Sequence, residues 1–270
     1  MSPVEIAGKH ALITGASRGI GEVIARELTS RGARCTLVAR ESEALHRVAA
    51  SYGAHALPAD LTDPAQYGDL VARAEDAQGP LDIFVNNAAR TSMRDFWELS
   101  GEELRGTVNI NLVAAMDLAR QAVRSMRPRG TGALIAVSSI TGEFAIPRFA
   151  AYGPSKAALT MFWMILEREL RGSGLSVCVL PLGAVPGTAN YNEAVSHSAV
   201  AKVAANFERF GRLTPELVAR KVVDVVAADR SGVVPMPASS VPTMTFRLLP
   251  VRLGDLIFAR RDRDRDRDRD

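Results

Sequence analysis

The chain has 270 residues, of which 47% are apolar and 23% are charged, and its formal net charge is +3 at pH 7. These values are ordinary for a soluble globular protein with a substantial core, and the length allows one large domain or two small ones. The net charge is small and no basic run carries interleaved aromatic residues, so we expect no nucleic-acid partner.

Residue usage also bears on the compartment. Cys35 and Cys178 lie inside apolar runs, which favours buried free thiols in a reducing cytoplasm. The histidines have no metal-ligand spacing, and we expect no metal site. The first residues do not read as a signal peptide, and no apolar segment reaches the roughly 18 residues needed to cross a bilayer. We therefore expect a cytoplasmic protein that does not span a membrane, and membrane contact is not favoured.

The first predicted strand is His10–Thr14, a short apolar run that suits burial on both faces. It leads into Gly15-Ala-Ser-Arg-Gly19-Ile-Gly21 and then into a helical pattern that ends near Gly32. This order is typical of a dinucleotide site, because small residues let the backbone approach a pyrophosphate and the helix N-terminus supplies amides. A structural tight turn is the alternative interpretation of these glycines.

Arg34–Ala39 is the second predicted strand, and Arg40 follows at its carboxyl end. A dinucleotide fold that prefers NAD usually has Asp or Glu here, whereas an arginine suits the extra phosphate of NADP. Arg18 in the glycine loop could approach the same phosphate. A solvated strand end is the alternative for Arg40, and Glu41 could turn towards the ribose instead. The pattern favours NADP (NADPH).

Strand and helix patterns then alternate up to about residue 240. Further strands are predicted at His55–Pro58, Leu81–Val85, Ala133–Val137, Leu175–Leu180 and Gly232–Met236. Helices are predicted over Glu43–Tyr52, from Pro64 towards Gln78, from the Ser100/Glu103 capping box to about Met126, over Ala151–Arg171, and after Thr214. This rhythm predicts an α/β fold with a doubly wound parallel sheet of the Rossmann type, with about seven strands and helices on both faces.

Polar residues interrupt the apolar pattern at two places. Asn109 and Asn111 lie inside the long predicted helix, where asparagine is a mediocre helix former. They indicate a functional role or, alternatively, a tertiary hydrogen bond in the core. Between Pro181 and Leu213 the pattern loosens, which predicts a lid or a binding loop.

Tyr152 and Lys156 share one face of a predicted helix, about 6 Å apart along its axis. A nearby ammonium lowers the pKa of a phenol by about 1–3 units, towards the range in which tyrosine works as an acid or base. A surface helix with an extended lysine is the alternative.

We predict a single dinucleotide-binding and catalytic domain over residues 1–259, followed by a tail. The last part of this domain, 243–259, alternates between apolar and basic residues. Three roles remain open for it: packing on its own domain or on a partner subunit, a wall at the substrate entrance, or a membrane-surface patch. Residues 260–270 carry six Arg and five Asp in near alternation. With no apolar side chain to bury, this tail is expected to be disordered.

Together, the motifs resemble those of the short-chain dehydrogenase/reductase family in its compact branch, from about Gly8 to Met236. In family order they are Thr14-Gly15-Ala16-Ser17-Arg18-Gly19-Ile20-Gly21, Asp60-Leu61, Asn86-Asn87-Ala88-Ala89, Asn109-Ile110-Asn111, Ser138-Ser139, and Tyr152 to Lys156. The resemblance implies an NADP(H)-dependent oxidoreductase that transfers hydride between the nicotinamide and a carbonyl or secondary alcohol. The apolar neighbours of the site suggest a largely apolar substrate; they are Phe144, Ile146, Phe149, Leu182 and Val185.

The resemblance also implies residue roles. Tyr152 would be the acid/base, Lys156 would lower its pKa and bind the nicotinamide ribose, and Ser139 would orient the substrate carbonyl. Asn111 would hold a water in the proton relay behind Lys156. Asp60 would contact the adenine, and Asn87 would lie beside the adenosine ribose. The full cofactor-binding set that it implies is Gly15, Ser17, Arg18, Gly19, Ile20, Gly21, Arg40, Asp60, Leu61, Asn87, Ala88, Tyr152, Lys156, Pro181, Val185 and Thr188.

Two departures from the family pattern concern the cofactor. Ala89 stands at a usual glycine and would crowd the cofactor. Leu182 also stands at an expected glycine, and the threonine after it is shifted to Thr188.

The resemblance further implies a homodimer or homotetramer through the long helices near 100–127 and 151–172. The adjacent Phe162, Trp163 and Met164 offer more apolar surface than one inner helix face needs. A catalytically silent NADP-binding sensor or scaffold is the alternative function, which the presence of all four catalytic residue types disfavours. A sugar-nucleotide epimerase of the same superfamily is a third, disfavoured by the short chain and the glycine spacing.

Overall fold

The computed structural model describes residues 4–195 and 211–239. Seven parallel strands form one sheet in the order β3-β2-β1-β4-β5-β6-β7. The strands are β1 His10–Thr14, β2 Arg34–Ala39, β3 His55–Pro58, β4 Ile83–Asn86, β5 Gly132–Ser139, β6 Leu175–Leu182 and β7 Gly232–Val233. The predicted doubly wound parallel sheet is thereby confirmed. The expectations for 243–259 and for the 260–270 tail fall outside the described residues.

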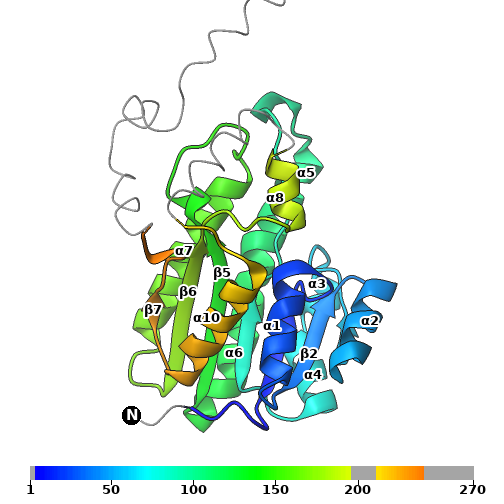
Figure 1. Cartoon of the computed structure of the whole chain (residues 1–270), viewed down its shortest axis with the longest axis vertical. Coiled ribbons are helices and arrows are strands. Elements are labelled where there is room, and N and C mark those ends of the chain that lie inside the picture. The colour runs from blue at the N-terminus through cyan, green and yellow to red at the C-terminus, as the bar shows by residue number, and fades with distance from the viewer. Residues whose placement is uncertain (1–3, 196–210, 240–270) are drawn as a thin grey trace, which may run out of the picture.

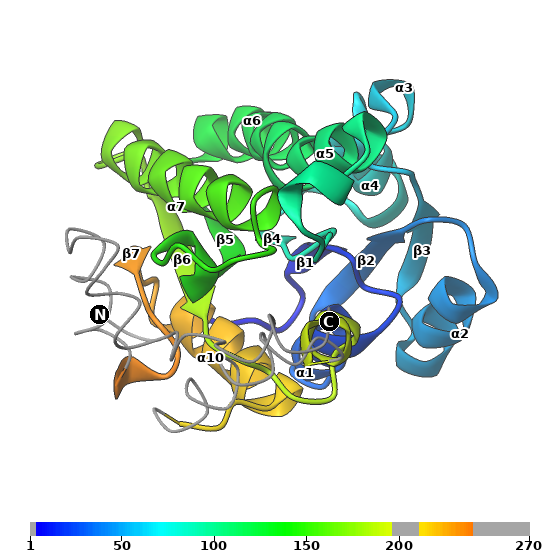
Figure 2. The same cartoon turned by 90° about the horizontal axis from the view of Figure 1, so that it is seen from above.

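Helices cover both faces of the sheet (Figure 2). One face carries α1 Gly19–Thr29, α2 Glu43–Tyr52 and α10 Pro215–Ala227. The other carries α4 Leu70–Gln78, α6 Ala115–Met126 and α7 Tyr152–Glu169. Side chains from one strand divide between the two cores: Ile83 and Val85 pack towards α1, and Phe84 packs towards α6. Because both faces are buried, the central strands read as continuous apolar runs.

Three short helices complete the described fold: α3 Pro64–Tyr67, α5 Gly101–Val108 and α8 Ala189–Val195. Figure 1 shows α5 and α8 together at one end of the molecule. β1 lies between β2 and β4, so successive connections leave it in opposite directions along the sheet. In open α/β sheets, ligands bind beyond the carboxyl ends of the strands at such a switch point.

Some element boundaries differ from the sequence-based prediction. The helix predicted from Pro64 to Gln78 is two helices, because the backbone leaves helical geometry at Asp69 (φ −125°, ψ 17°). β4 begins at Ile83 rather than at Leu81. β5 and β6 each run two residues further than predicted, whereas β7 is shorter and only an isolated bridge joins Leu182 to Met236.

The long helix predicted after Ser100 is interrupted. Its capping box is present, but the π-helical segment Asn109–Ala114 separates α5 from α6. π-Helical turns are frequent at functional sites. Here the segment carries Asn111, which is fully buried.

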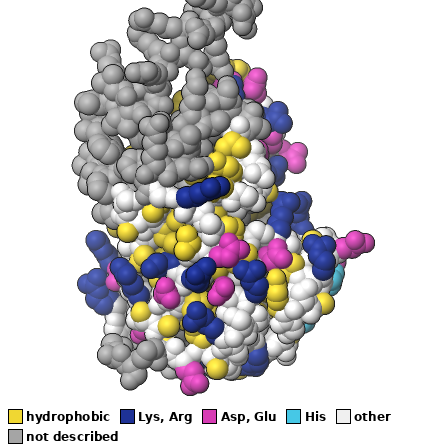
Figure 3. Space-filling view, in the orientation of Figure 1, with side chains coloured by type: hydrophobic (Ala, Val, Ile, Leu, Met, Phe, Trp, Pro, Cys, Tyr) yellow, Lys and Arg dark blue, Asp and Glu magenta, His cyan; other side chains and the backbone are white. Residues whose placement is uncertain are grey.

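Acidic and basic side chains are interspersed over the face that carries α1 and α10 (Figure 3). Arg26 and Glu216 form an ion pair of 3.6 Å between these two helices. Cys35 and Cys178 are free and buried, and burial raises the pKa of each thiol to about 12. Among the described residues, no helix is long and apolar enough to cross a membrane, and no group of side chains could hold a metal ion.

Candidate active site

Tyr152 and Lys156 lie in the first turns of α7, as their spacing predicts. The Lys156 Nζ lies 5.8 Å from the centroid of the Tyr152 ring. The same Nζ donates a hydrogen bond of 3.0 Å to the carbonyl oxygen of Val137 on β5. This bond ties the ammonium to β5 while it stays beside the Tyr152 ring.

Burial of Lys156 is nearly complete, with 1% of its surface exposed. Loss of water disfavours the ammonium and lowers the pKa of Lys156 to about 8. The side chain therefore keeps its charge near neutral pH. A buried lysine with a strongly shifted pKa is more typical of a functional site than of a structural core.

The pKa of Tyr152 moves in the direction opposite to the sequence-based expectation. Burial raises it to about 12, and a hydrogen bond with Ser139 lowers it by less. The expectation of a lowered pKa is therefore wrong for this structure, because desolvation of the phenolate outweighs the stabilising contacts. The phenol holds its proton at neutral pH.

Ser139 ends β5 and caps the 3₁₀ segment η4, Ile140–Gly142. Its Oγ accepts hydrogen bonds from the backbone N–H of Thr141 at 3.2 Å and from the Thr141 hydroxyl at 2.9 Å. The neighbouring Ser138 is buried and bonds instead to Thr160 and to the Lys156 carbonyl. Of the two serines, Ser139 is the one that contacts Tyr152; that it orients a substrate carbonyl stays a prediction.

The Asn111 side chain joins two segments of the site. Its Oδ1 accepts from the backbone N–H of Arg90 at 2.8 Å, and its Nδ2 donates to the Arg90 carbonyl at 2.9 Å and to Ser155 Oγ at 3.0 Å. Ser155 Oγ in turn donates to the Tyr152 carbonyl at 2.7 Å. Both amide hydrogens are thus used to fix the loop after β4 against α7. The water contact expected of Asn111 stays a prediction.

The glycine loop between β1 and α1 has the geometry of an anion site. Gly15 and Gly19 have positive φ angles of +66° and +61°. A side chain at Gly21 would lie 2.3 Å from the Gly15 carbonyl oxygen, so only glycine lets α1 pack so closely on the turn. Arg18 at the N-cap makes no capping bond, whereas Ser42 caps α2. Within the described ranges, the first amides of α1 therefore have no side-chain cap, which fits a pyrophosphate.

Asn87 and Thr14 hold this loop to the end of β4. Asn87 Nδ2 donates to the carbonyl oxygens of Thr14 and Gly15 at 2.9 and 3.2 Å. Thr14 Oγ1 accepts the backbone N–H groups of Asn87 and Ala88, each at 3.0 Å. The described contacts of the Asn87 side chain thus organise the loop, and its position beside a ribose stays a prediction.

The predicted adenosine end of the site carries charges of both signs. Arg18 and Arg40 are exposed. Glu41 is turned towards α2, where its Oε1 lies 2.6 Å from His46 Nε2. Asp60 accepts two hydrogen bonds of 2.8 Å from Thr62, and these bonds, together with the charge of Arg40, hold its pKa below the usual range.

The residues predicted to follow the sixth strand are largely engaged in backbone contacts, and the first two of them, Pro181 and Leu182, are the last residues of β6. The Pro181 carbonyl accepts from the N–H of Met236 at 2.9 Å. Thr188 Oγ1 donates to the Val185 carbonyl at 2.8 Å and accepts from the N–H of Tyr191 at 3.3 Å, which caps α8. Leu182 is buried and pairs in register with Ser139.

An apolar cluster surrounds the Tyr152 ring. Met93 and Phe149 are buried beside it, with Ala89 and Ile146 packed against the same cluster. The Phe149 and Tyr152 ring centroids are 6.0 Å apart. Ala89 stands where the motif usually has glycine, and its methyl group thus packs against this apolar cluster.

Two ties hold the loops around this cluster. Arg148 donates to both carboxylate oxygens of Asp95, at 3.2 and 3.1 Å. Thr91 donates to Glu193 on α8 at 2.9 Å. The loops after β4 and β5 and the helix after β6 are therefore linked at the same end of the sheet.

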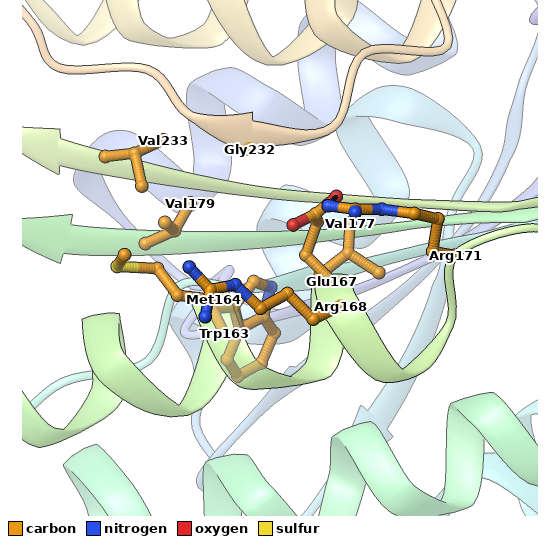
Figure 4. Close-up of a pocket in the computed structure, with 9 residues that line it drawn as sticks. All are labelled: Trp163, Met164, Glu167, Arg168, Arg171, Val177, Val179, Gly232 and Val233. Atoms are coloured by element: carbon orange, nitrogen blue, oxygen red, sulfur yellow. Dashed lines mark ion pairs between the residues drawn. The ribbon is translucent and has the colours of Figure 1, made fainter.

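A separate pocket of about 170 Å³ lies between α7 and the strands β6 and β7 (Figure 4). Trp163, Arg168 and Val233 are among its lining residues. Trp163 is eleven positions beyond Tyr152, roughly 16 Å along the helix axis. This pocket is therefore not part of the group around Tyr152.

Several contributors were not singled out from the sequence: Thr14, Thr141, Ser155, Asp95 and Arg148. Thr14 and Ser155 stand inside recognised motifs, so their hydroxyl groups were the available signal. The roles of Thr141, Asp95 and Arg148 depend on loops that meet only in the folded chain.

Comparison with known proteins finds relatives named as a reductase and as a dehydrogenase. A ketoacyl reductase, HetN, of Nostoc sp. is 36% identical over 188 residues, which cover 68% of this chain and 66% of HetN, about two thirds. A 2,3-dihydro-2,3-dihydroxybenzoate dehydrogenase of Bacillus subtilis is 38% identical over 175 residues, which cover 63% of this chain and 67% of that protein. A solved structure of a short chain dehydrogenase/reductase family protein superposes with a TM-score of 0.75 at 25% identity, covering 88% of this chain and 100% of that one.

The sequence model of the short chain dehydrogenases matches residues 9–198, which include the glycine loop, Asn111, Ser139 and the Tyr152–Lys156 pair. The chain therefore belongs to the short-chain dehydrogenase/reductase family of hydride-transferring oxidoreductases.

Proposed function

We propose that the protein is an NADP(H)-dependent reductase that converts a largely apolar ketone to a secondary alcohol. The observation that carries this proposal is a protonated phenol, Tyr152, held beside a buried ammonium and a serine hydroxyl at the end of the sheet. A bound nicotinamide cofactor supplies or accepts the hydride. The glycine loop and the uncapped start of α1 would hold its pyrophosphate.

Each side chain has a distinct task in this proposal. Tyr152 donates its proton to the carbonyl oxygen as negative charge develops there. Ser139 donates a hydrogen bond to the same oxygen and orients it. Lys156 stabilises the phenolate that Tyr152 leaves behind, because an ammonium in a site from which water is excluded interacts strongly with a nearby anion.

The pKa values support the reductive direction. A phenol whose pKa is raised to about 12 is almost fully protonated at neutral pH, so the proton donor is ready. Oxidation of an alcohol needs the phenolate, and burial of Tyr152 disfavours that form. The reverse reaction is therefore expected to gain from alkaline pH. The relative named as a ketoacyl reductase fits the reductive direction, and the relative named as a dehydrogenase fits the reverse.

The apolar cluster supports an apolar substrate. Met93, Phe149, Ala89 and Ile146 pack beside the Tyr152 ring, so they would contact substituents of a carbonyl held by Tyr152 and Ser139. The nearby Arg148 is engaged by Asp95. We therefore expect ketones with alkyl or aryl substituents to be better substrates than ketones with a carboxylate next to the carbonyl.

The preference for NADP(H) is supported by charge. Arg40 and Arg18 are exposed near the predicted position of the 2′-phosphate, and Ala39 offers no carboxylate to a free ribose hydroxyl. Glu41, the residue best able to hold that hydroxyl, contacts His46 instead. A charge-assisted hydrogen bond contributes roughly 1.5–3 kcal/mol, so two of them favour NADPH over NADH by about 10²-fold or more.

Steady-state assays with NADPH and NADH on a panel of alkyl, aryl and carboxylated ketones test this proposal. We expect kcat/KM to be highest with NADPH and an uncharged ketone, and Arg40→Ala to lose at least tenfold with NADPH but little with NADH. Arg31→Ala, an exposed arginine at the other end of α1, is the control. Equal efficiency with both cofactors would contradict the NADP(H) preference. NADPH binding without turnover of any ketone or alcohol would favour the silent sensor or scaffold.

A further inference from the structure

Thr141 makes two hydrogen bonds to one oxygen atom of the candidate site. Its backbone N–H and its hydroxyl both donate to Ser139 Oγ, at 3.2 and 2.9 Å. A serine hydroxyl has one hydrogen to donate and two lone pairs that accept. With both lone pairs engaged by Thr141, the remaining capacity of Ser139 is donation of its own hydrogen.

We propose that Thr141 is a positioning residue that makes Ser139 a donor only, its single hydrogen directed at the phenol oxygen in the free protein and at the substrate oxygen once a ketone is bound. This inference rests on the proposed function, in which Tyr152 gives its proton to the substrate. If Ser139 Oγ could accept a hydrogen bond, the Tyr152 hydroxyl could donate to it. The proton needed by the substrate would then point at Ser139 instead of at the carbonyl oxygen. Thr141 removes that alternative.

A donating Ser139 would assist the ionisation of Tyr152. The hydrogen bond with Ser139 lowers the pKa of Tyr152, against the effect of burial. A donor to the phenol oxygen stabilises the phenolate and lowers the pKa, whereas an acceptor from the phenol hydroxyl stabilises the neutral form and raises it. A Ser139 that donates is therefore the arrangement that assists proton release.

Close packing fixes Thr141 in place. A side chain at Gly142 would lie 2.7 Å from the backbone nitrogen of Ala157, and one at Gly153 would lie 3.1 Å from the Thr141 carbonyl oxygen. These glycines allow η4 to rest directly on the first turns of α7. The backbone of Thr141 is thus packed against the helix that carries Tyr152.

Thr141→Val tests the proposal, because valine keeps the shape and the backbone N–H but has no hydroxyl. We expect kcat for ketone reduction to fall about 5- to 10-fold, as for the loss of one hydrogen bond, with KM for NADPH unchanged. In the alcohol-oxidation direction, the pH–rate profile should show the pKa assigned to Tyr152 at a higher value. The reason is that one Ser139 lone pair becomes free, so Ser139 donates to the phenol oxygen for less of the time. Thr141→Ser restores the hydroxyl and should restore both the rate and the pH profile.

Thr141→Ala guards against a folding defect in the valine variant, because alanine also lacks the hydroxyl but adds no bulk. Circular dichroism and melting temperature identify a variant that is only destabilised. In such a variant the pH–rate profile of the folded fraction would be the same as in the wild type. A wild-type rate and pH profile in Thr141→Val or Thr141→Ala, beside an inactive Ser139→Ala, would overturn this inference and leave the proposed function intact. Full activity of both Ser139→Ala and Tyr152→Phe would instead refute the proposed function.

Discussion

Tyr152 and Lys156 are neighbouring ionisable groups that one environment shifts in opposite directions. Burial disfavours whichever form is charged, so it raises the pKa of the phenol to about 12 and lowers that of the ammonium to about 8. At neutral pH the tyrosine is neutral and the lysine is charged. This is the protonation state that a proton donor and its supporting cation require.

The buried charge of Lys156 has a measurable effect on stability. Because its folded-state pKa lies below 10.5, the unfolded state binds the proton more tightly. The cost to folding is therefore complete below about pH 8 and disappears as pH rises through 10.5. We expect Lys156→Met to raise the free energy of unfolding at pH 7 by about 1–3 kcal/mol, after loss of the Val137 hydrogen bond.

Urea unfolding of wild type and Lys156→Met at pH 7 and pH 10 measures this effect. The stability difference should shrink at the higher pH. Turnover should fall by at least about 10²-fold, and NADPH affinity should fall as well if Lys156 contacts the ribose. A variant that is less stable than wild type at both pH values would show that Lys156 supports the fold rather than straining it.

At the scale of the elements, the glycine loop and α1 act as one unit. Gly21→Ala would place a methyl group 2.3 Å from the Gly15 oxygen and 2.6 Å from Asn87 Nδ2. The loop or the start of α1 must shift, so we expect NADPH affinity to fall at least about tenfold and the melting temperature to decrease. Isothermal titration and thermal unfolding measure both quantities.

Gly53→Ala is the matched control for this substitution. Gly53 caps α2 with a φ of +62°, and a methyl group at this position would meet no other atom within 4 Å. The variant should lose about 1 kcal/mol of stability through backbone strain and keep its NADPH affinity. Equal NADPH affinity in Gly21→Ala and wild type would show that the glycine loop does not bind the cofactor.

The elements that the sequence predicts well are those whose signals are local. Both-face burial makes β1 and the middle of β2 largely apolar runs, and the caps at Ser100 and Thr214 mark helix starts. The π-helical segment and the break at Asp69 were not predicted, because they depend on packing between distant segments. The direction of the Tyr152 pKa shift was missed for the same reason: it depends on how deeply the loops bury the ring.

At the scale of the whole molecule, α5, α6 and α7 lie side by side in Figure 2. We define an apolar surface by the exposed apolar side chains of these helices and of the π-helical segment. Its exposed members, each between 36% and 48% accessible, are Leu104, Val113, Met116, Met161 and Ile165. Of the three residues singled out from the sequence, Trp163 is buried in the core instead. Pairing of two subunits through this surface stays a prediction.

Introducing charge into this surface tests the pairing. Met161→Glu with Ile165→Glu should convert a dimer or tetramer to smaller species in sedimentation velocity at micromolar concentration, because a carboxylate is costly to bury without a partner. Leu217→Glu on the opposite layer, at a position 42% exposed, is the control and should leave the sedimentation coefficient unchanged. A monomeric wild-type protein would exclude the pairing outright.

The central claim is that the Tyr152 hydroxyl supplies the proton in a hydride-transfer reaction. Tyr152→Phe removes that hydroxyl and leaves the ring beside Phe149. The most direct measurement is the single-turnover rate of NADPH oxidation with a ketone that the wild type reduces, in protein whose NADPH affinity has been measured separately. We expect the rate to fall by at least about 10²–10⁴-fold with NADPH affinity nearly unchanged. A variant that binds NADPH normally and retains more than about a tenth of the wild-type rate would contradict the account.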